Sequence, residues 1–253
     1  MADPEAVGRH RRALMSFARL TGNGGETSRV LERDGVVASI APAVPHASIV
    51  NSVAYRDADA LAANLDELAR TYDEAGVRAW TVWVPEDDRE AASLLESAGH
   101  RLDAAPTAMV ADLAALPDAE DAELDWDANA EPEDVARIND SAYGVPVGVF
   151  GAAIGRVRDI DGVRLYEARV EGAPACVLAT LDNVDDCEVY LVATLADHRG
   201  RGLARRLLHH ALTEARERGL AVSSLQATKL GYPVYERLGY ERICALEMWE
   251  RRK

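Results

Sequence analysis

The sequence predicts an α/β protein with mixed sheets, arranged in two similar halves. Short β-branched and apolar stretches alternate with amphipathic helical segments along the 253 residues. A shift of 143 residues places Arg56 on Arg199 and Gly76 on Gly219, and it aligns the predicted elements of both halves. Between the halves, residues 117–134 contain nine acidic and no basic side chains, which is typical of a linker.

The N-terminal half begins with a predicted helix that reaches about residue 20. Strands are predicted near 36–40 and 47–54, followed by a helix over 57–74 that Gly76 ends. The remaining elements of this half are predicted as a strand over 77–84, a helix over 94–100 and a strand around Met109.

The C-terminal half follows the acidic stretch with a helix near Pro132. Strands over 162–169 and 173–181 flank Glu171-Gly172, a dipeptide that suits a hairpin turn. The later elements are predicted as strands over 187–194, 220–226 and 240–249, a helix ended by Gly219, and a helix around 234–238. The apolar face of the long helix is predicted to consist of Leu203, Leu207, Leu208, Ala211, Leu212 and Ala215.

Composition and charge exclude several classes of protein. With 48% hydrophobic and 28% charged residues, the chain is neither disordered nor fibrous. It lacks an apolar run of membrane-spanning length and begins with acidic residues, so we expect a cytoplasmic protein. Three cysteines without a C-x-x-C motif indicate neither a disulfide framework nor a metal site. A net charge of −15 disfavours nucleic acid and anionic membranes as partners.

The motif R-G-R-G-L-A at residues 199–204 lies between a predicted strand and the long helix. Glycines allow the backbone to approach a ligand, and the first amides of a helix attract anions. Four arginines, at positions 199, 201, 205 and 206, add positive charge in an acidic protein. The motif therefore indicates a pyrophosphate site, although a glycine-rich turn before a surface helix has the same pattern.

The order of this motif, its helix, a strand, V-Y-E-R-L-G-Y and a closing strand resembles the GNAT superfamily of acetyl-CoA-dependent N-acetyltransferases. The resemblance covers residues 131–253. It implies acetyl-CoA as a co-substrate and no metal. Neither a Walker lysine nor a G-x-G-x-x-G motif accompanies the glycines, which disfavours nucleotide hydrolysis and dinucleotide binding.

The resemblance also implies which residues contact coenzyme A. Arg199, Gly202 and Ala204 match the family signature Q/R-x-x-G-x-G/A, whose amides hold the pyrophosphate. The preceding strand pairs with the pantetheine arm, chiefly at Val192 and Thr194. The cofactor-binding residues expected on this basis are Leu191, Val192, Ala193, Thr194, Arg199, Gly200, Arg201, Gly202, Leu203, Ala204, Arg205 and Thr228. At Thr228 the family often has an asparagine.

Two residues are implied as catalytic. Tyr235 lies where many family members have a tyrosine that protonates the coenzyme A thiolate, and a phenol of pKa near 10 suits this role. Glu188 has the position of a general base that deprotonates the acceptor, directly or through water. Tyr143 and Phe150 are expected to contact the acceptor. For each of these four, the alternative is an ordinary structural role.

In the N-terminal half, R-D-A-D-A-L replaces R-G-R-G-L-A, so Asp57 and Asp59 stand where a pyrophosphate would bind. Leu95 occupies the place of Tyr235 after a three-residue length change. The sequence therefore predicts two tandem GNAT-like folds: a degenerate domain over 1–116, a linker over 117–130 and a catalytic domain over 131–253. The alternatives are a single elongated domain and an acidic loop within one domain.

The predicted function is transfer of an acetyl group from acetyl-CoA to a primary amine, by direct attack in a ternary complex. The alternative is a non-catalytic acyl-CoA-binding regulator. The sequence leaves open the acceptor, a longer acyl donor and the oligomeric state, a homodimer included.

Overall fold

A computed structural model describes residues 4–119 and 123–253 of the chain. It divides into two compact units, neither of which is continuous in sequence. The first unit combines Met1–Ala108, Ala152–Val157 and Ile243–Lys253, and the second combines Met109–Gly151 and Arg158–Arg242.

The first unit is a mixed sheet with the strand order β1-β2-β3-β4-β12. Strands β3 and β4 are parallel, whereas the other neighbouring pairs are antiparallel, and β5 also pairs with β12. The strands are β1 (Arg29–Arg33), β2 (Val36–Ile40), β3 (Ser52–Tyr55), β4 (Ala79–Pro85), β5 (Arg101–Ala104) and β12 (Glu241–Arg252). The helices are α1 (Pro4–Asn23), α2 (Ala58–Glu74) and α3 (Arg89–Ser97).

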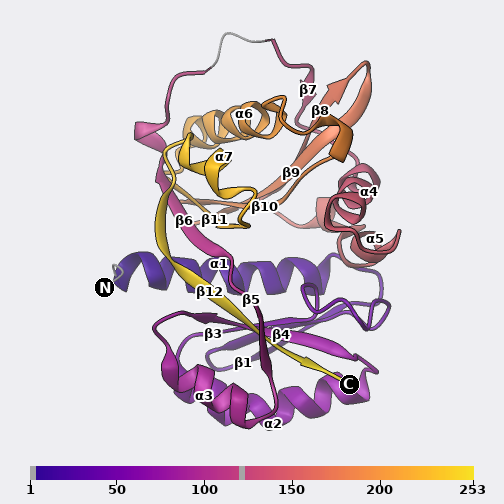
Figure 1. Ribbon diagram of the computed structural model, residues 1–253, viewed down its shortest axis with the longest axis vertical. Helices are drawn as coiled ribbons and strands as arrows, with labels where there is room; N and C mark the ends of the chain where they lie inside the picture. The colour runs from indigo at the N-terminus through magenta and orange to yellow at the C-terminus, as the bar shows by residue number, and fades with distance from the viewer. Residues whose placement is uncertain (1–3, 120–122) are drawn as a thin grey trace. The chain divides into compact units, whose positions relative to one another are not determined.

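The second unit repeats this plan around the strand order β7-β8-β9-β10-β11-β6 (Figure 1). Strands β10 and β11 are parallel, and the pairs from β7 to β10 are antiparallel. The strands are β6 (Thr107–Asp112), β7 (Trp126–Asp127), β8 (Val163–Val170), β9 (Ala173–Asn183), β10 (Asp186–Thr194) and β11 (Val222–Ala227). The helices are α4 (Pro132–Tyr143), α6 (Leu203–Glu217) and α7 (Tyr232–Glu236), together with the first residues of α5 (Val149–Ile154), whose remainder belongs to the first unit.

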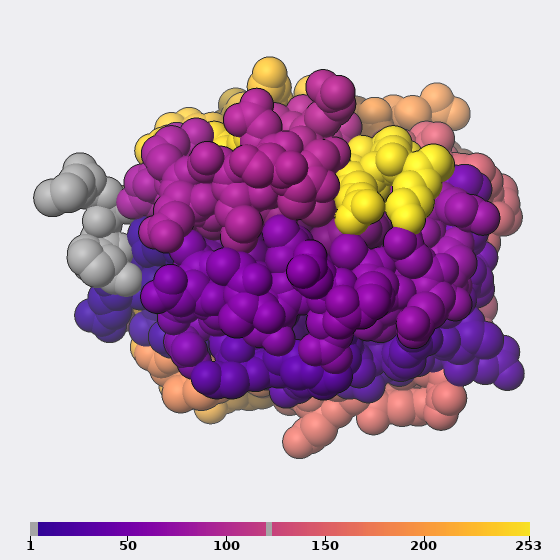
Figure 2. Space-filling view, turned by 90° about the horizontal axis from the view of Figure 1, so that it is seen from below, coloured from indigo at the N-terminus to yellow at the C-terminus, as the bar shows by residue number. Residues whose placement is uncertain are grey.

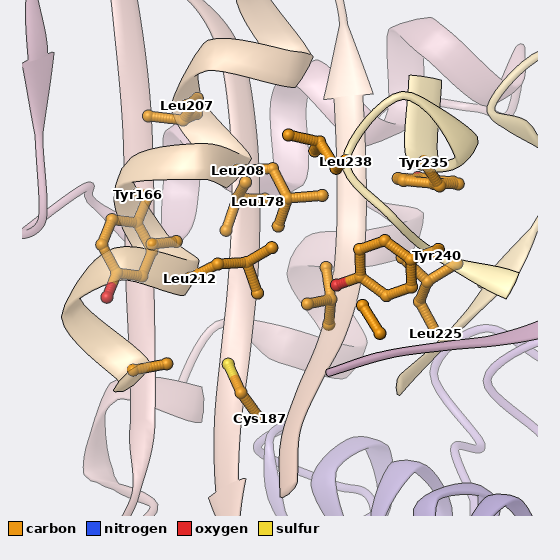
Figure 3. Close-up of a cluster of buried hydrophobic side chains, with 14 of the residues drawn as sticks. Tyr166, Leu178, Cys187, Leu207, Leu208, Leu212, Leu225, Tyr235, Leu238 and Tyr240 are labelled. Carbon is orange, nitrogen blue, oxygen red and sulfur yellow. The ribbon is translucent and has the colours of Figure 1, made fainter. Parts of the chain in front are cut away.

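Helix α6 forms the core of the second unit with the face that its periodicity predicts. The six residues predicted to be buried are the buried residues of the helix. Leu207, Leu208 and Leu212 pack with Leu178 and Leu225 of the sheet (Figure 3). Each such side chain contributes about 1.5–3 kcal/mol on burial, so this face fixes α6 on the sheet.

Several local predictions are confirmed. Glu171 and Gly172 join β8 to β9 with φ of 53° and 79°, as a two-residue hairpin requires. Helix α4 has Pro132 in its first turn, where a missing N–H costs nothing. Helix α2 ends before Gly76, which has a φ of 74°.

Other predictions are wrong in detail. The strand expected over 47–54 begins only at Ser52. Asn51 explains the difference, because its amide accepts from the N–H of Ala41 at 2.7 Å and donates to the carbonyls of Val44 and Ala47 at 3.1 Å. These bonds stabilise a turn in an apolar stretch. Strands β1 and β5 were not predicted, because charged and exposed residues interrupt any apolar alternation.

The closing strand has its partners in the N-terminal half. Residues 246–252 of β12 pair with β4, from Leu246 opposite Pro85 to Arg252 opposite Ala79. Figure 2 shows the last residues of the chain, in yellow, among residues of the N-terminal half. In return, the N-terminal half supplies residues from Met109 onward, in β6, to the second unit. The two units therefore exchange strands.

The two halves share details of helix termination. Gly76 and Gly219 donate to Asp73 and Arg216 at 3.0 and 2.9 Å. Gly99 and Gly239, after α3 and α7, both have a φ of 86°. Gly76 and Gly219 are 143 residues apart, and Gly99 and Gly239 are 140 residues apart. These are the two shifts at which the halves of the sequence align, before and after the three-residue length change.

The acidic segment contacts α6 on both sides of residues 120–122, which lie outside the described residues. The carbonyl of Pro117 accepts from Nε2 of His209 at 2.7 Å, and that of Glu123 accepts from Arg206 at 2.9 Å. Trp126 stacks on His210 with ring centroids 4.5 Å apart. The expected linker, residues 117–130, thus includes a part that packs on the second unit.

Three further observations concern the described part of the chain. No helix there is both long and apolar enough to span a membrane. No cluster of three or more histidine, cysteine, aspartate or glutamate side chains there is arranged to hold a metal ion. Cys176, Cys187 and Cys244 are buried free thiols.

Candidate active site

The parallel ladder between β10 and β11 is short, and β10 departs from regular geometry where it ends. The ladder runs from Asp186 opposite Val222 to Val189 opposite Leu225. Beyond it, the register between β10 and β9 shifts between Tyr190 and Ala193. Leu191, inside this bulge, has a φ of 56°. A left-handed conformation is costly for a leucine, and such backbone strain is concentrated at functional sites.

The chain leads from β10 to α6 through two glycines that adopt left-handed backbone conformations. Gly200 and Gly202 have φ of 76° and 74°, which glycine adopts without strain. Gly202 is the N-cap of α6, and no side chain caps the helix. The N–H groups of the first turn of α6 therefore carry the positive end of the helix dipole without a side-chain acceptor, which is the setting of an anion site.

The arginines around this loop have different roles. Arg199 donates to the carbonyls of Thr194 at 3.1 Å and Ala142 at 3.3 Å, so its guanidinium ties the loop to β10 and α4. Arg206 donates to the carbonyls of Glu123 and Arg201. Arg201 is exposed, and Arg205 is half-buried. Arg199 and Arg206 therefore position the backbone of the loop as well as adding charge.

The other expected coenzyme A contacts divide into backbone and side-chain candidates. Leu203 and Ala193 are buried, with 5% and 4% exposure, so only their backbone groups are available to a ligand. The Thr194 hydroxyl donates to the sulfur of Cys176 at 3.2 Å. Thr228 is exposed, and its hydroxyl accepts from the N–H of Gly231 at 3.2 Å, which starts the turn into α7.

Tyr235, on α7, has a buried ring (Figure 3). Within the described residues its hydroxyl has no hydrogen-bond partner. The other buried tyrosines each have one; the partner groups belong to Asp88, Ser39, Glu214, Glu188 and Ser223. Burial raises the pKa of Tyr235, and nearby Tyr143 and Cys176 raise it further. The phenol therefore stays protonated, as a proton donor must.

Gly231 determines the position of the Tyr235 ring. A Cβ atom at Gly231 would lie 2.8 Å from Cε2 of Tyr235 and 3.3 Å from its Cζ. A larger residue would displace the ring, so the glycine is required here by close packing.

Glu188 is enclosed by hydrogen-bond donors. It is 1% exposed, and its two carboxylate oxygens accept from the amide of Asn183 at 2.9 Å and the hydroxyl of Tyr190 at 2.8 Å. This setting preserves a carboxylate but shields it from bulk water.

Tyr143 and Phe150 lie together, with ring centroids 5.7 Å apart. Tyr143 is 48% exposed at the end of α4, whereas Phe150 is buried with 3% exposure. The buried carboxylate of Asp140 accepts from the N–H groups of Gly148 at 2.7 Å and Phe150 at 2.9 Å. Asp140 thus holds the loop between the two rings, a role that sequence analysis did not assign.

A pocket of about 290 Å³ lies along the outer side of α6. Arg205, Arg206, His209 and Arg237 line it together with Trp126. Its lining includes neither Tyr235 nor a residue of the bulge in β10, so it is not the place where Tyr235 could act.

The equivalent helix of the N-terminal half differs at its first turn. Asp57 is the N-cap of α2, and its carboxylate accepts from the N–H of Ala60 at 2.8 Å. Arg56 pairs with Asp57 at 2.8 Å and with Asp34 at 3.0 Å. The chain's own carboxylate therefore occupies the anion position of this helix. Leu95 is fully buried in the core.

Comparison with known proteins finds similarity to acetyltransferases. Residues 186–243 match the model of a family described as Acetyltransferase (GNAT) domain. An uncharacterized N-acetyltransferase of Escherichia coli (strain K12), YjgM, is 36% identical over 81 residues, 31% of this chain and 48% of the relative. The match thus spans about half the length of that curated relative.

Two solved structures resemble most of the chain. A GCN5-related N-acetyltransferase from Kribbella flavida has a TM-score of 0.66 and 18% identity, covering 94% of this chain and 95% of its own. A tandem GNAT protein from the clavulanic acid biosynthesis pathway has a TM-score of 0.57 and 14% identity, covering 100% and 97%. The chain therefore has a mixed α/β, GNAT-like fold.

Proposed function

We propose that the protein is an N-acetyltransferase that moves an acetyl group from acetyl-CoA to a primary amine. One feature carries the proposal: β10 separates from β11 at a strained bulge and leads directly to the uncapped N-terminus of α6. A site for an extended ligand with a diphosphate needs both an open strand and a set of helix amides. The family match over residues 186–243 covers these same elements.

The residues of the second unit fit acetyl-CoA chemically. The amides of residues 200–204 are suited to the pyrophosphate, with Arg201 and Arg205 supplying positive charge. Backbone groups of Leu191, Val192, Ala193 and Thr194 are suited to the amide-rich pantetheine arm. Thr228 stays in the proposed binding set, although its hydroxyl accepts from Gly231.

Acetyl-CoA supplies an activated acetyl thioester, and this chain supplies the groups around it. The amine nitrogen bonds to the carbonyl carbon as the carbon–sulfur bond breaks. The N–H of Val192 stabilises the negative charge on the carbonyl oxygen. Tyr235 gives its proton to the departing thiolate, and the proton that the attacking nitrogen loses as it becomes an amide restores the phenol. Because Glu188 is buried, we propose that it removes the ammonium proton through water. Tyr143 and Phe150 contact the acceptor.

We further propose that the chain consists of two tandem GNAT-like folds, over 1–116 and 131–253, which are joined by residues 117–130. The two folds exchange strands β6 and β12. The matching helix ends and strand orders support this interpretation. So does the likeness to a tandem GNAT protein over the whole chain. The Asp57 cap supports a degenerate first fold that does not bind acetyl-CoA.

The test is incubation with acetyl-CoA and a library of primary amines, with detection of free coenzyme A thiol and of product mass. The Tyr235→Phe variant serves as the control for background thioester cleavage. Acetylated amine formed much faster with the wild-type protein than with the variant is the expected result. Acetyl-CoA binding without any product would favour the non-catalytic regulator, and absence of binding would contradict both.

A further inference from the structure

The bulge in β10 is held by a buried side chain from another element. Asn139, on α4, is fully buried, and its Nδ2 donates to the carbonyl of Leu191 at 3.1 Å. The same Nδ2 donates to the carbonyl of Val135 at 2.8 Å. Because both partners are carbonyl oxygens, only the nitrogen of the amide can face them, which fixes its orientation.

Asn139 is costly to the fold. Its Oδ1 is buried without a hydrogen-bond partner within the described residues. A buried acceptor left unpaired destabilises a protein, and an apolar residue of similar shape would avoid that penalty. The side chain therefore calls for an explanation other than stability, and its long-range bond to the strained Leu191 supplies one.

The carbonyl of Leu191 and the N–H of Val192 belong to one peptide group. The described residues contain no cis peptide bond, so in this planar group the oxygen and the hydrogen point in opposite directions. Fixing the oxygen fixes the direction of the N–H. Donation to the oxygen also polarises the peptide group and makes its N–H a stronger donor.

We infer that Asn139 is a positioning residue that aims and polarises the Val192 amide at the acyl carbonyl oxygen of the bound thioester. The inference rests on the proposed function, since it assigns a task to the same site. Asn139 touches neither substrate in this scheme. It acts through the Leu191–Val192 peptide group, which is held in place before the ligand binds.

The experiment measures the carbonyl stretching band of acetyl-CoA labelled with ¹³C at the carbonyl, bound to the protein without an amine. In the wild-type protein we expect the band at a lower frequency than in water, because hydrogen bonding weakens the C=O bond. In Asn139→Leu we expect much of this displacement to be lost. When an acceptor amine is present, kcat of Asn139→Leu should fall roughly tenfold, and its KM for acetyl-CoA should stay nearly unchanged. The loss is smaller than the ~10²–10³-fold loss on deleting an oxyanion donor, because the Val192 N–H is still present.

Asn64→Leu is the matched control. Asn64 lies in helix α2 and donates from Nδ2 to the carbonyl four residues earlier, at 2.8 Å, as Asn139 does to Val135. Within the described part of the chain, its amide makes no second bond of the kind that Asn139 makes to Leu191. This variant should leave the infrared band and kcat at their wild-type values.

Asn139→Ser provides a second variant if the leucine substitution prevents folding. A serine hydroxyl can still bond the carbonyl four residues earlier in its helix but is too short to reach Leu191. It should show the same loss of band displacement. Equal band positions in the wild type and a folded Asn139 variant would overturn the inference while leaving the proposed function intact. Failure of the wild-type protein to bind acetyl-CoA would instead contradict the proposed function.

Discussion

At the scale of single residues, the hydroxyl of Tyr235 has a different environment from those of the other buried tyrosines. Tyr240, whose ring centroid lies 5.9 Å away, bonds Ser223 at 2.6 Å. Tyr235 has no such partner within the described residues. Because the Tyr235 oxygen is also not among the fully buried polar atoms without a partner, it is open to a bound substrate.

The first prediction is that Tyr235→Phe lowers kcat on the order of 10²-fold or more, while acetyl-CoA affinity changes little. Only the proton donor is removed, and no hydrogen bond of the resting protein is lost. Steady-state kinetics and calorimetric titration measure the two effects. Tyr240→Phe is the control, because it removes a structural hydroxyl next to the same ring and should lower stability more than kcat. Wild-type turnover by a folded Tyr235→Phe variant would rule out the acid role.

The second prediction concerns the base. A general base works only when deprotonated, so kcat/KM should rise with pH through the pKa of that base. Glu188→Gln should remove this acidic limb. The fold should survive, because a glutamine can accept from Asn183 and donate to the hydroxyl of Tyr190, which can rotate. If the acidic limb persists in the variant at an unchanged pH, another group is the base.

At the scale of elements, the first turns of α6 and α2 differ in the way that the proposed anion site requires. Gly202 leaves the amides of α6 without a side-chain cap, whereas the carboxylate of Asp57 accepts from an amide of α2. The two helices end with the same backbone hydrogen bonds, so the halves agree in structure at the end of the helix and differ at its start.

The third prediction is that Gly202→Asp abolishes acetyl-CoA binding, whereas Gly202→Asn keeps most of it. Both side chains tolerate the left-handed conformation that Gly202 adopts, and they have the same shape. The pair therefore separates charge from backbone strain. A carboxylate there repels the pyrophosphate by about 1–4 kcal/mol per charge pair at 4 Å. Calorimetry on both variants measures the difference, and equal affinities would refute the proposed pyrophosphate site.

Elements with strong periodicity could be predicted from the sequence, and contacts made across the fold could not. The buried face of α6 was predicted residue by residue, because every third or fourth position is apolar. Asn51 could not be identified as the cause of a turn, since its three partners only become neighbours once the chain folds. The same holds for Asn139 and Asp140, whose bonds to Leu191 and Phe150 span 52 and 10 residues.

At the scale of the whole molecule, the exchanged strands make the two units interdependent. Residues 246–252 complete the sheet of the first unit, so removing them should destabilise a part of the chain remote in sequence. The sequence predicted this strand but not its partners, because strand pairing depends on which edges are left open after the rest of each sheet forms. The exchange would let the half that we propose to be degenerate persist as a structural partner of the half that we propose to be catalytic.

The last prediction is that each chain binds one acetyl-CoA. In the second unit, glycines at positive φ and an uncapped helix offer open amides. In the first, Asp57 accepts from an amide of α2, and its pKa is lowered mainly by the hydrogen bond from Arg56 and then by that from Ala60, so it is ionised at neutral pH. A second pyrophosphate would have to displace this bound carboxylate. Calorimetric titration should give a stoichiometry near one, and Gly202→Asp should reduce it to zero. A value near two, or binding that survives Gly202→Asp, would place a functional site in the N-terminal half and contradict its assignment as degenerate.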